Sequence, residues 1–300
     1  MINQRTKDRI ESLATHYKKL ISSNTKAINE IAIAEIPEMV YNSNAIENST
    51  LTLKDTEDIL LRDTVKKDHD IREVYEAKNL AKITESLLQS TTVPMTTQQM
   101  LSLHKLLLNG IREDWAGRFR RNDEWVRVGA HVGANPDFVP ELINDLFNEY
   151  TGSTDRYFLD NIAWFHAEFE TIHPFNDGNG RMGRVLINQQ LMNLGYPPVI
   201  IPNKGKHTSY YPAFDSYRTT GKYNDFTDLF AGLLIESLYK RITLLSAPKI
   251  STVSAWAKAN GVAGNAAINK AIRGTIPAFR LRAKWMIATD YHDSSSSAIT

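Results

Sequence analysis

A run of twelve residues in the second half of the chain combines a base, a carboxylate, three glycines and two guanidinium groups. The run reads His173-Pro174-Phe175-Asn176-Asp177-Gly178-Asn179-Gly180-Arg181-Met182-Gly183-Arg184. Glycine permits positive φ angles and close approach of the backbone to a ligand, and a helix N-terminus presents free N–H groups at the positive end of its dipole. The glycines lie just before and inside a predicted helix start. The sequence therefore predicts a nest of amides that binds an anion.

Four side chains of this run fit a bound polyphosphate. Arg181 and Arg184 are three residues apart, so a helix places both on similar sides, where two guanidinium groups suit phosphates. Asp177 offers an oxygen ligand beside the predicted nest, which suits a Mg²⁺ that also contacts substrate phosphate. His173 has an ordinary pKa near neutrality and can accept a proton from an attacking hydroxyl. Each feature is common alone, but their concentration indicates a functional site.

The run resembles the motif of the Fic (filamentation induced by cAMP) family, H-P-F-x-[D/E]-G-N-G-R-x-x-R, and every defined position matches. Residues 103–110 and 117–120 look like the segments that precede this motif in the family, so the resemblance covers roughly residues 40–245. It implies a mainly α-helical fold with a β-hairpin flap. It also implies a protein adenylyltransferase, which moves AMP from ATP to a Ser, Thr or Tyr hydroxyl of a target protein.

The resemblance assigns roles within the run. His173 would be the general base, Phe175 would anchor the loop in the core, and Asp177 would hold a Mg²⁺ that bridges the α- and β-phosphates of ATP. Arg181 would contact the β-phosphate region and Arg184 the γ-phosphate. The other nucleotide contacts in the run would come from Gly178, Asn179, Gly180, Met182 and Gly183. Attack at the α-phosphorus would release pyrophosphate. His166, in the preceding helix, is expected to be structural.

Residues 43–48 are similar to the inhibitory motif of the family, [S/T]-x-x-x-E-[G/N]. Ser43 and Glu47 are four residues apart, so they share one face of a helix. Glu47 could reach Arg184 and form an ion pair that occupies the guanidinium meant for the γ-phosphate. We therefore expect autoinhibition. Family members with this glutamate can also remove AMP from targets, so a deAMPylase stays open as an alternative.

Residues 123–134 look like the family's flap, because Val126, Val128, Ala130 and Val132 alternate with other residues. The flap would pair with an extended segment of the target protein, as in strand addition. The resemblance also places Val128 and Gly129 near the nucleotide. It places Tyr210 and Tyr211 near the adenine, together with Asn203. A structural hairpin and core aromatic residues are the alternatives.

Helical patterns surround the motif and must position it. We expect helices over residues 5–33, over 38–48 after a break at Pro37, from a cap at Thr52, over 68–90, from Thr96 or Thr97 to 108, and over 141–150, 158–172, 182–194, 207–218 and 225–246. The predicted organisation has four parts. Residues 1–95 form an N-terminal helical region that includes the inhibitory helix (about 38–48), and residues 96–247 form the catalytic domain. Residues 248–290 form a small basic domain, and residues 291–300 form a disordered tail.

The small basic domain has seven basic residues and no Asp or Glu between positions 249 and 284. Predicted helices over residues 253–262 and 265–272, followed by a strand pair within 276–287, resemble winged helix-turn-helix domains of the excisionase sort. Lys270 and Arg273 would lie on the second helix, and Arg280, Arg282 and Lys284 on the wing. Residues 249–284 could therefore bind nucleic acid, and a protein-docking module is the alternative.

Composition limits the remaining functions. The absence of cysteine excludes disulfides and thiolate metal sites. The N-terminus lacks the apolar core of a secretory signal, and no apolar run approaches the ~20 residues that span a bilayer, so we expect a cytoplasmic protein without a membrane partner. A homo-oligomer stays open. Two other functions compete with AMP transfer: a kinase or phosphocholine transferase, and a DNA-binding regulator with a Fic-like nucleotide sensor. Gly178 and Gly180 favour AMP transfer, because related kinases depart from these glycines.

Overall fold

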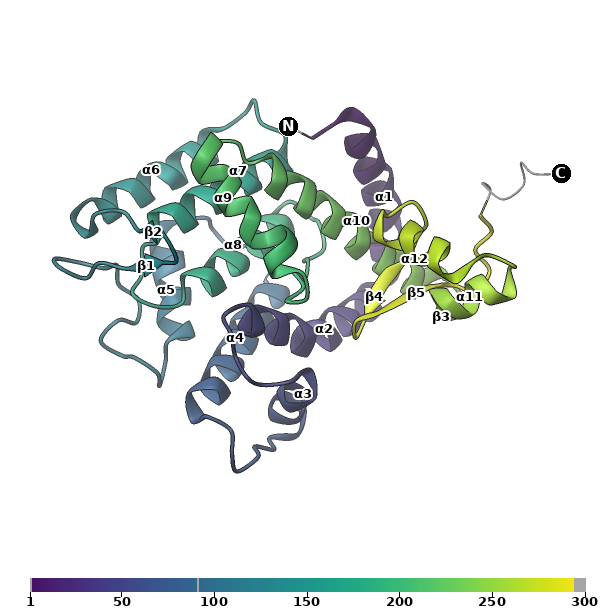
Figure 1. Ribbon diagram of the computed structural model, residues 1–300, viewed down its shortest axis with the longest axis horizontal. Coiled ribbons are helices and arrows are strands. Elements are labelled where there is room, and N and C mark those ends of the chain that lie inside the picture. The colour runs from purple at the N-terminus through teal and green to yellow at the C-terminus, as the bar shows by residue number, and fades with distance from the viewer. Residues whose placement is uncertain (1, 91, 294–300) are drawn as a thin grey trace. The chain divides into compact units, whose positions relative to one another are not determined.

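The computed structural model describes residues 2–90 and 92–293, and Figure 1 shows that helices dominate. The chain divides into two compact units: residues 32–230 build most of the first, and residues 3–31 with those from 231 onward build the second. The predicted domain limits at residues 95, 247 and 290 remain predictions. Most of the predicted disordered tail, residues 294–300, lies outside the described residues.

The first unit contains the predicted active-site loop. Its elements are the later part of α2 (Thr25–Ile46), α3 (Leu53–Arg62), α4 (Ile71–Gln89), α5 (Thr97–Leu107), β1 (Arg127–Val128), β2 (His131–Val132), the 3₁₀ turn η1 (Pro136–Phe138), α6 (Val139–Gly152), α7 (Phe158–Ile172), α8 (Asn179–Asn193), the π-helical turn η2 (Lys206–Tyr210), α9 (Tyr211–Thr220) and the beginning of α10 (Asn224–Ser246). Strands β1 and β2 form an antiparallel hairpin, so the hairpin predicted within residues 123–134 is confirmed.

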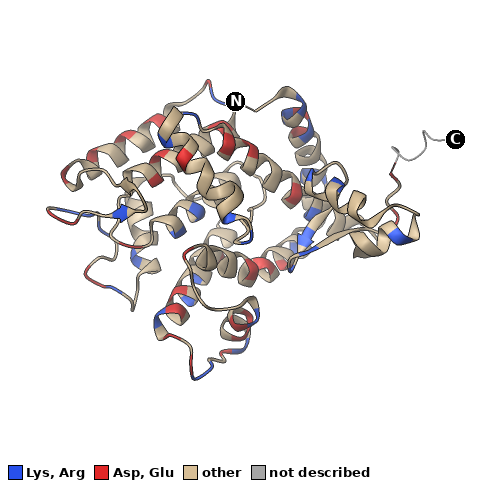
Figure 2. Ribbon diagram, in the orientation of Figure 1, with Lys and Arg blue, Asp and Glu red and all other residues tan. Residues whose placement is uncertain are grey.

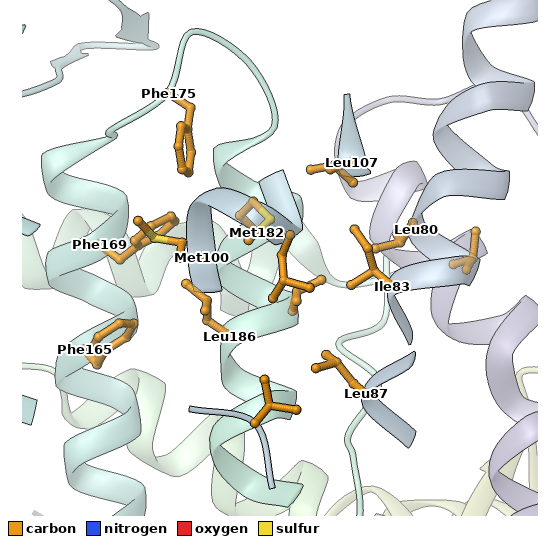
Figure 3. Close-up of a cluster of buried hydrophobic side chains, with 14 of the residues drawn as sticks. Leu80, Ile83, Leu87, Met100, Leu107, Phe165, Phe169, Phe175, Met182 and Leu186 are labelled. Atoms are coloured by element: carbon orange, nitrogen blue, oxygen red, sulfur yellow. The ribbon is translucent and has the colours of Figure 1, made fainter. Parts of the chain in front are cut away.

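The core of the first unit holds the active-site loop between two helices. In Figure 3, Phe165 and Phe169 of α7 and Met182 of α8 point into one cluster of buried apolar side chains. Phe175, at the turn between these helices, is fully buried in the same cluster. Burying one such side chain contributes about 1.5–3 kcal/mol. The loop is therefore fixed from beneath by its own aromatic residue, as the resemblance implies.

Local capping explains several helix starts. The Thr52 side chain accepts from Asp55 N, and the Asp55 side chain accepts from Thr52 N, which is a reciprocal capping box. Thr96 caps α5 with its hydroxyl, which accepts from Gln99 N. Both predicted caps are confirmed, as is the predicted helix over residues 158–172.

Several predicted helix limits differ from the structure. The helix expected over residues 5–33 divides at Asn24, whose side chain bonds Leu20 O and competes with the helical ladder. The expected break at Pro37 is absent, because Pro37 lies inside α2. An interior proline costs about 3 kcal/mol, and burial of the neighbouring Ile36 and Val40 in the core is of a size to offset it. Helix α8 begins at Asn179 and not at Met182.

The second unit includes α1 (Gln4–Ser23), α11 (Val253–Ala259) and α12 (Gly264–Ile272). Its three-stranded antiparallel sheet has the order β3 (Ile250–Thr252), β5 (Lys284–Ala288), β4 (Phe279–Leu281). Residues from both short helices and the sheet share one small core. Both predicted helices and the hairpin are present, although α11 ends at Ala259 and not at residue 262, and β3 was not expected. The winged helix-turn-helix assignment remains a prediction.

Within residues 2–90 and 92–293, no helix combines the length and the apolar character that crossing a membrane requires.

Candidate active site

His173 follows the last residue of α7 and adopts a left-handed backbone conformation, with φ at 54°. Such a conformation is strained for a non-glycine residue and persists only where its surroundings enforce it. The N–H of His173 donates to Phe169 O at 2.9 Å, and its carbonyl accepts from Arg120 Nε at 2.7 Å. Burial lowers the pKa of His173 to about 4. The imidazole is therefore neutral at pH 7 and can accept a proton.

Arg120 ties the hairpin to the loop, a role that its position in the sequence does not reveal. This side chain is 1% exposed and donates to three carbonyls besides that of His173: Glu124 O at 3.0 Å, Ala134 O at 2.8 Å and Ile172 O at 3.2 Å. These carbonyls come from both sides of the hairpin and from the end of α7. One guanidinium thus fixes the general-base candidate relative to the hairpin.

The loop is closed by the side chain of Asn179. Its Oδ1 accepts from Phe175 N and its Nδ2 donates to Phe175 O, both at 2.8 Å. The Phe175 ring stacks on His104, with ring centroids 3.6 Å apart. His104 Nδ1 accepts from Gly117 N at 3.1 Å, so the proton lies on Nε2, which donates to Asp177 O at 3.0 Å. Burial lowers the pKa of His104 to about 4, consistent with this neutral form.

Each of the three loop positions favours glycine for a different physical reason. Gly178 has φ at 83°, and a Cβ there would lie 2.9 Å from Leu107 Cδ2. A Cβ on Gly180 would lie 2.2 Å from Glu47 Oε1, and one on Gly183 would lie 2.4 Å from a carboxylate oxygen of Glu170. Gly180 and Gly183 are therefore needed for close packing of acidic side chains against α8. Met182 N donates to Gly178 O, which is the first hydrogen bond of the helix. The N–H groups before Met182 therefore have no partner within α8, and they favour an anion at the helix N-terminus.

Arg181 and Asp177 belong to a network of four charged residues. Arg181, which is 3% exposed, places Nη2 at 2.9 Å from Asp177 Oδ1 and Nη1 at 3.0 Å from Glu76 Oε1. Arg72 also binds both carboxylates. Periodicity did not reveal Arg72 or Glu76, which lie on a helix about a hundred residues earlier in the chain. The network orients Arg181 toward the N-terminus of α8.

Asp177 has the chemistry of a Mg²⁺ ligand. Its oxygens face the start of α8 and are shared between two guanidinium groups. Among the described residues, no three His, Cys, Asp or Glu side chains cluster as a metal site. Mg²⁺ is commonly held by one or two carboxylates together with substrate phosphates. The donor set therefore fits a metal that arrives with a nucleotide, with Asp177 as its protein ligand.

Arg184 is buried against the end of α2, where the predicted inhibitory residues lie. Its Nη2 donates to Glu47 Oε1 and to Ser43 O, both at 2.8 Å, and its Nε donates to Ser43 Oγ at 2.9 Å. Nη1 makes no hydrogen bond within the part of the chain that the structure describes. Two residues far along the chain hold the last turn of α2: Lys206 Nζ donates to Ala45 O and Ile46 O, and Tyr211 OH donates to Ile46 O.

Several predicted nucleotide contacts have a different environment from the one expected. Tyr210 is 2% exposed, its ring packs on Phe214, and its hydroxyl lies 2.9 Å from His166 Nε2. The side chain of Met182 is fully buried in the core, so only its backbone faces the helix start. The structure thus places the Tyr210 ring in the core and not on an open pocket.

Val128 and Gly129 lie on the surface of the first unit, whereas Asn203 is half-buried. Val128 is 46% exposed on the hairpin, and a Cβ on Gly129 would meet nothing within 4 Å. A Cβ on Gly133 would lie 3.1 Å from His173 Cβ, so the base of the hairpin adjoins the general-base candidate. Asn203 N donates to Asn42 Oδ1 at 2.9 Å, which connects that segment to α2.

Comparison with known proteins gives one family. Residues 94–191 match the model described as the Fic/DOC family. The protein adenylyltransferase Fic of Drosophila melanogaster is 33% identical over 225 residues, which cover 69% of this chain and 44% of that protein. Its counterpart from Drosophila willistoni is 37% identical over 180 residues, or 57% of this chain and 35% of that protein. The chain thus spans less than half the length of these curated relatives.

Two solved structures have a similar fold. A Fic domain containing signaling protein from Bacteroides thetaiotaomicron has a TM-score of 0.68 at 24% identity, covering 79% of this chain and 96% of that one. Fic-1 (residues 134–508) from C. elegans has a TM-score of 0.67 at 25% identity, covering 79% of this chain and 71% of that one.

Proposed function

This chain belongs to the Fic/DOC family, and we propose that it is a protein adenylyltransferase that moves AMP from ATP to a hydroxyl of a target protein. One observation carries the proposal. The loop between α7 and α8 presents a neutral buried imidazole beside a helix N-terminus flanked by Arg181 and Arg184. This arrangement can bind a polyphosphate and accept a proton at the same place.

The reaction follows from these groups. The neutral imidazole of His173 takes the proton of the target hydroxyl, whose oxygen forms a bond to the α-phosphorus of ATP. The bond from the α-phosphorus to the oxygen of the β-phosphate breaks, and pyrophosphate leaves. Backbone amides at the start of α8 and the guanidinium of Arg181 stabilise the charge that develops. A Mg²⁺ held by Asp177 would neutralise phosphate charge.

We further propose that Glu47 inhibits this reaction. Its carboxylate occupies Nη2 of Arg184 and lies against Gly180, where the terminal phosphate of ATP would need both the guanidinium and the helix start. Removal of the carboxylate would free Arg184. The same glutamate could orient a water molecule that removes AMP from a modified target. The deAMPylase alternative therefore involves the same residue.

Radiolabelled ATP distinguishes the candidate reactions. Glu47→Gly protein incubated with ATP labelled at the α-phosphate should become labelled itself, and His173→Ala in that background should not. Transfer of label from the γ-position would indicate a kinase instead. Loss of label from a purified AMP-modified target with the wild-type chain would indicate the reverse reaction. Transfer of neither label, together with nucleotide binding, would favour a sensor.

The hairpin is our candidate for the docking site of the target. Trp125, Val128 and Val132 are all exposed apolar side chains on or beside it, and its short strands pair with each other. An extended target segment could add to such an edge, with backbone hydrogen bonds that give register. Its closeness to His173 would place an acceptor hydroxyl at the imidazole.

Nucleic-acid binding by residues 249–284 is a second candidate. In favour, α11 and α12 pack together, and the β4–β5 hairpin has Arg282 and Ala283 at its tip with positive φ. Figure 2 shows the Lys and Arg positions of this module. Two of its basic residues are already paired, Arg280 with Glu236 and Lys270 with Asp293. A gel-shift titration with duplex DNA at increasing salt, compared with Arg273→Ala, tests this candidate.

A further inference from the structure

Glu170 is a buried carboxyl group beside His173 that the reaction above does not use. It lies on the last turn of α7, three residues before His173, and is 6% exposed. Its Oε2 is 3.6 Å from His173 Nδ1. Nδ1 also lies 3.4 Å from the backbone carbonyl oxygen of Glu170. The side of the imidazole away from the target hydroxyl thus faces one carboxyl group and one long carbonyl contact.

The other oxygen of Glu170 makes no hydrogen bond with any described residue. It lies against α8, where a Cβ on Gly183 would be 2.4 Å away. His166 Nδ1 also makes no hydrogen bond with any described residue, and it would lie 3.1 Å from a Cβ on Gly183. A buried polar group left unsatisfied costs about 1–3 kcal/mol. Stability of the fold therefore does not explain a carboxyl group at position 170.

Chemistry at His173 does explain it. When Nε2 takes a proton, the ring becomes an imidazolium whose Nδ1–H needs an acceptor. A carboxylate there holds the ring in one tautomer and stabilises the positive charge, as in other pairs of a base and the group that orients it. A side-chain rotation that shortens the 3.6 Å separation by less than 1 Å would produce a hydrogen bond.

We propose that Glu170 is a positioning residue whose carboxylate accepts the Nδ1–H of His173 and stabilises the imidazolium formed during AMP transfer. The inference rests on the proposed role of His173 as general base. In this role Glu170 would act through the imidazole and not on the reacting atoms.

The charges around Glu170 link it to the inhibitory segment. Burial and the neighbouring charge of Glu47 raise the pKa of Glu170 to about 8, while Arg184 and Arg218 oppose this rise. Facing His173 are Arg120, His131 and Glu47. Loss of the Glu47 charge would lower the pKa of Glu170, so more of it would be carboxylate at neutral pH.

The experiment compares Glu170→Gln and Glu170→Ala in the Glu47→Gly form of the whole chain. The matched control is Glu141→Gln, which changes an exposed carboxylate in the first turn of α6. Self-modification with ATP gives kcat and the KM for ATP across pH. We expect both Glu170 variants to lower kcat about 10- to 100-fold with KM unchanged, a part of what general-base catalysis supplies. The control should match its parent.

An NMR titration of ¹⁵N-labelled histidine measures the same contact without turnover. We expect the pKa of His173 in the Glu47→Gly parent to fall when Glu170 becomes Gln, with a change in tautomer. An unchanged His173 titration overturns the inference, and so does a shifted titration with unchanged kcat. If the parent transfers no AMP, the proposed function fails, while the titration still decides whether Glu170 holds the imidazole.

Discussion

Glu47 Oε1 lies 2.8 Å from Arg184 Nη2, although 137 positions separate these residues in the chain. The carboxylate also lies so close to the N-terminus of α8 that a Cβ on Gly180 would be 2.2 Å from it. One acidic side chain therefore occupies both the guanidinium and the amide end of the helix. In the proposed function, the terminal phosphate of ATP would compete with Glu47 for the same two partners.

Replacement of Glu47 by Gly should raise AMP transfer. A hydrogen bond to a charged group is worth about 1.5–3 kcal/mol, which corresponds to roughly a 10- to 100-fold rise in rate if the pair must open for ATP to bind productively. Self-modification with α-labelled ATP measures the change. Glu47→Gln, which retains the shape without the charge, should give a smaller rise. Equal rates in wild type and Glu47→Gly would contradict the inhibitory role.

Lys206 should stabilise the last turn of α2, and with it the position of the inhibitory Glu47. It is buried, and its Nζ donates to the last-turn carbonyls Ala45 O at 3.0 Å and Ile46 O at 3.1 Å, directly before Glu47. A cation at a helix C-terminus also interacts favourably with the helix dipole. Lys206→Met should therefore raise self-modification partway toward the level of Glu47→Gly and should lower the melting temperature. The matched control is Lys204→Met, an exposed lysine two positions away, which should change neither quantity.

Asn179→Ala should open the loop. The side chain makes two hydrogen bonds of 2.8 Å to the backbone of Phe175, and the substitution leaves both buried backbone groups without a partner. Each unsatisfied group costs about 1–3 kcal/mol. In the Glu47→Gly background we expect self-modification to fall by at least about 100-fold, together with a loss of stability in urea unfolding. Asn148→Ala, on an exposed part of α6, is the control, and an active Asn179→Ala protein would show that the loop geometry is not required.

The sequence predicted those parts of the site that are local in the chain. The motif from His173 to Arg184 determines its own turn, because Asn179 and Phe175 contact each other across four positions. Apart from the pair of Glu47 and Arg184, which the similarity to the inhibitory motif indicated, contacts between distant elements were not predictable. Arg120 and Lys206 are ordinary basic residues by spacing, and only the packed fold brings their side chains to the backbone carbonyls that they cap.

The incorrect prediction of a helix break at Pro37 has a physical cause. Pro37 was expected to break the helix because local backbone preference disfavours an interior proline, but tertiary burial of its neighbours prevails. The resemblance implies that Tyr210 lies near the adenine, with a core aromatic residue as the alternative, and the nucleotide contact remains a prediction. Aromatic residues at helical spacing bury large apolar areas, and here the ring lies in the core with His166.

Stability should depend on pH through His104. Burial lowers the pKa of His104 to about 4, below its ordinary value of 6.5, so the unfolded chain binds more protons between these values. The contribution of this residue to folding is present above pH 6.5 and is lost as the pH falls toward 4. Between pH 7.5 and pH 5.0 the loss is about 2 kcal/mol. Urea unfolding at the two pH values measures it.

The test compares pH differences between variants, because His104→Gln also removes the hydrogen bonds to Gly117 N and Asp177 O. That loss lowers stability at both pH values and cancels in the difference. Burial also lowers the pKa of His166 and His173. The His104→Gln protein should therefore still lose stability on acidification, but less than wild type by the contribution of His104. His16→Gln, on an exposed face of α1, should retain the full dependence. If His104→Gln loses as much stability on acidification as wild type, His104 is not held in its neutral form, and its assigned hydrogen bonds to the loop are wrong.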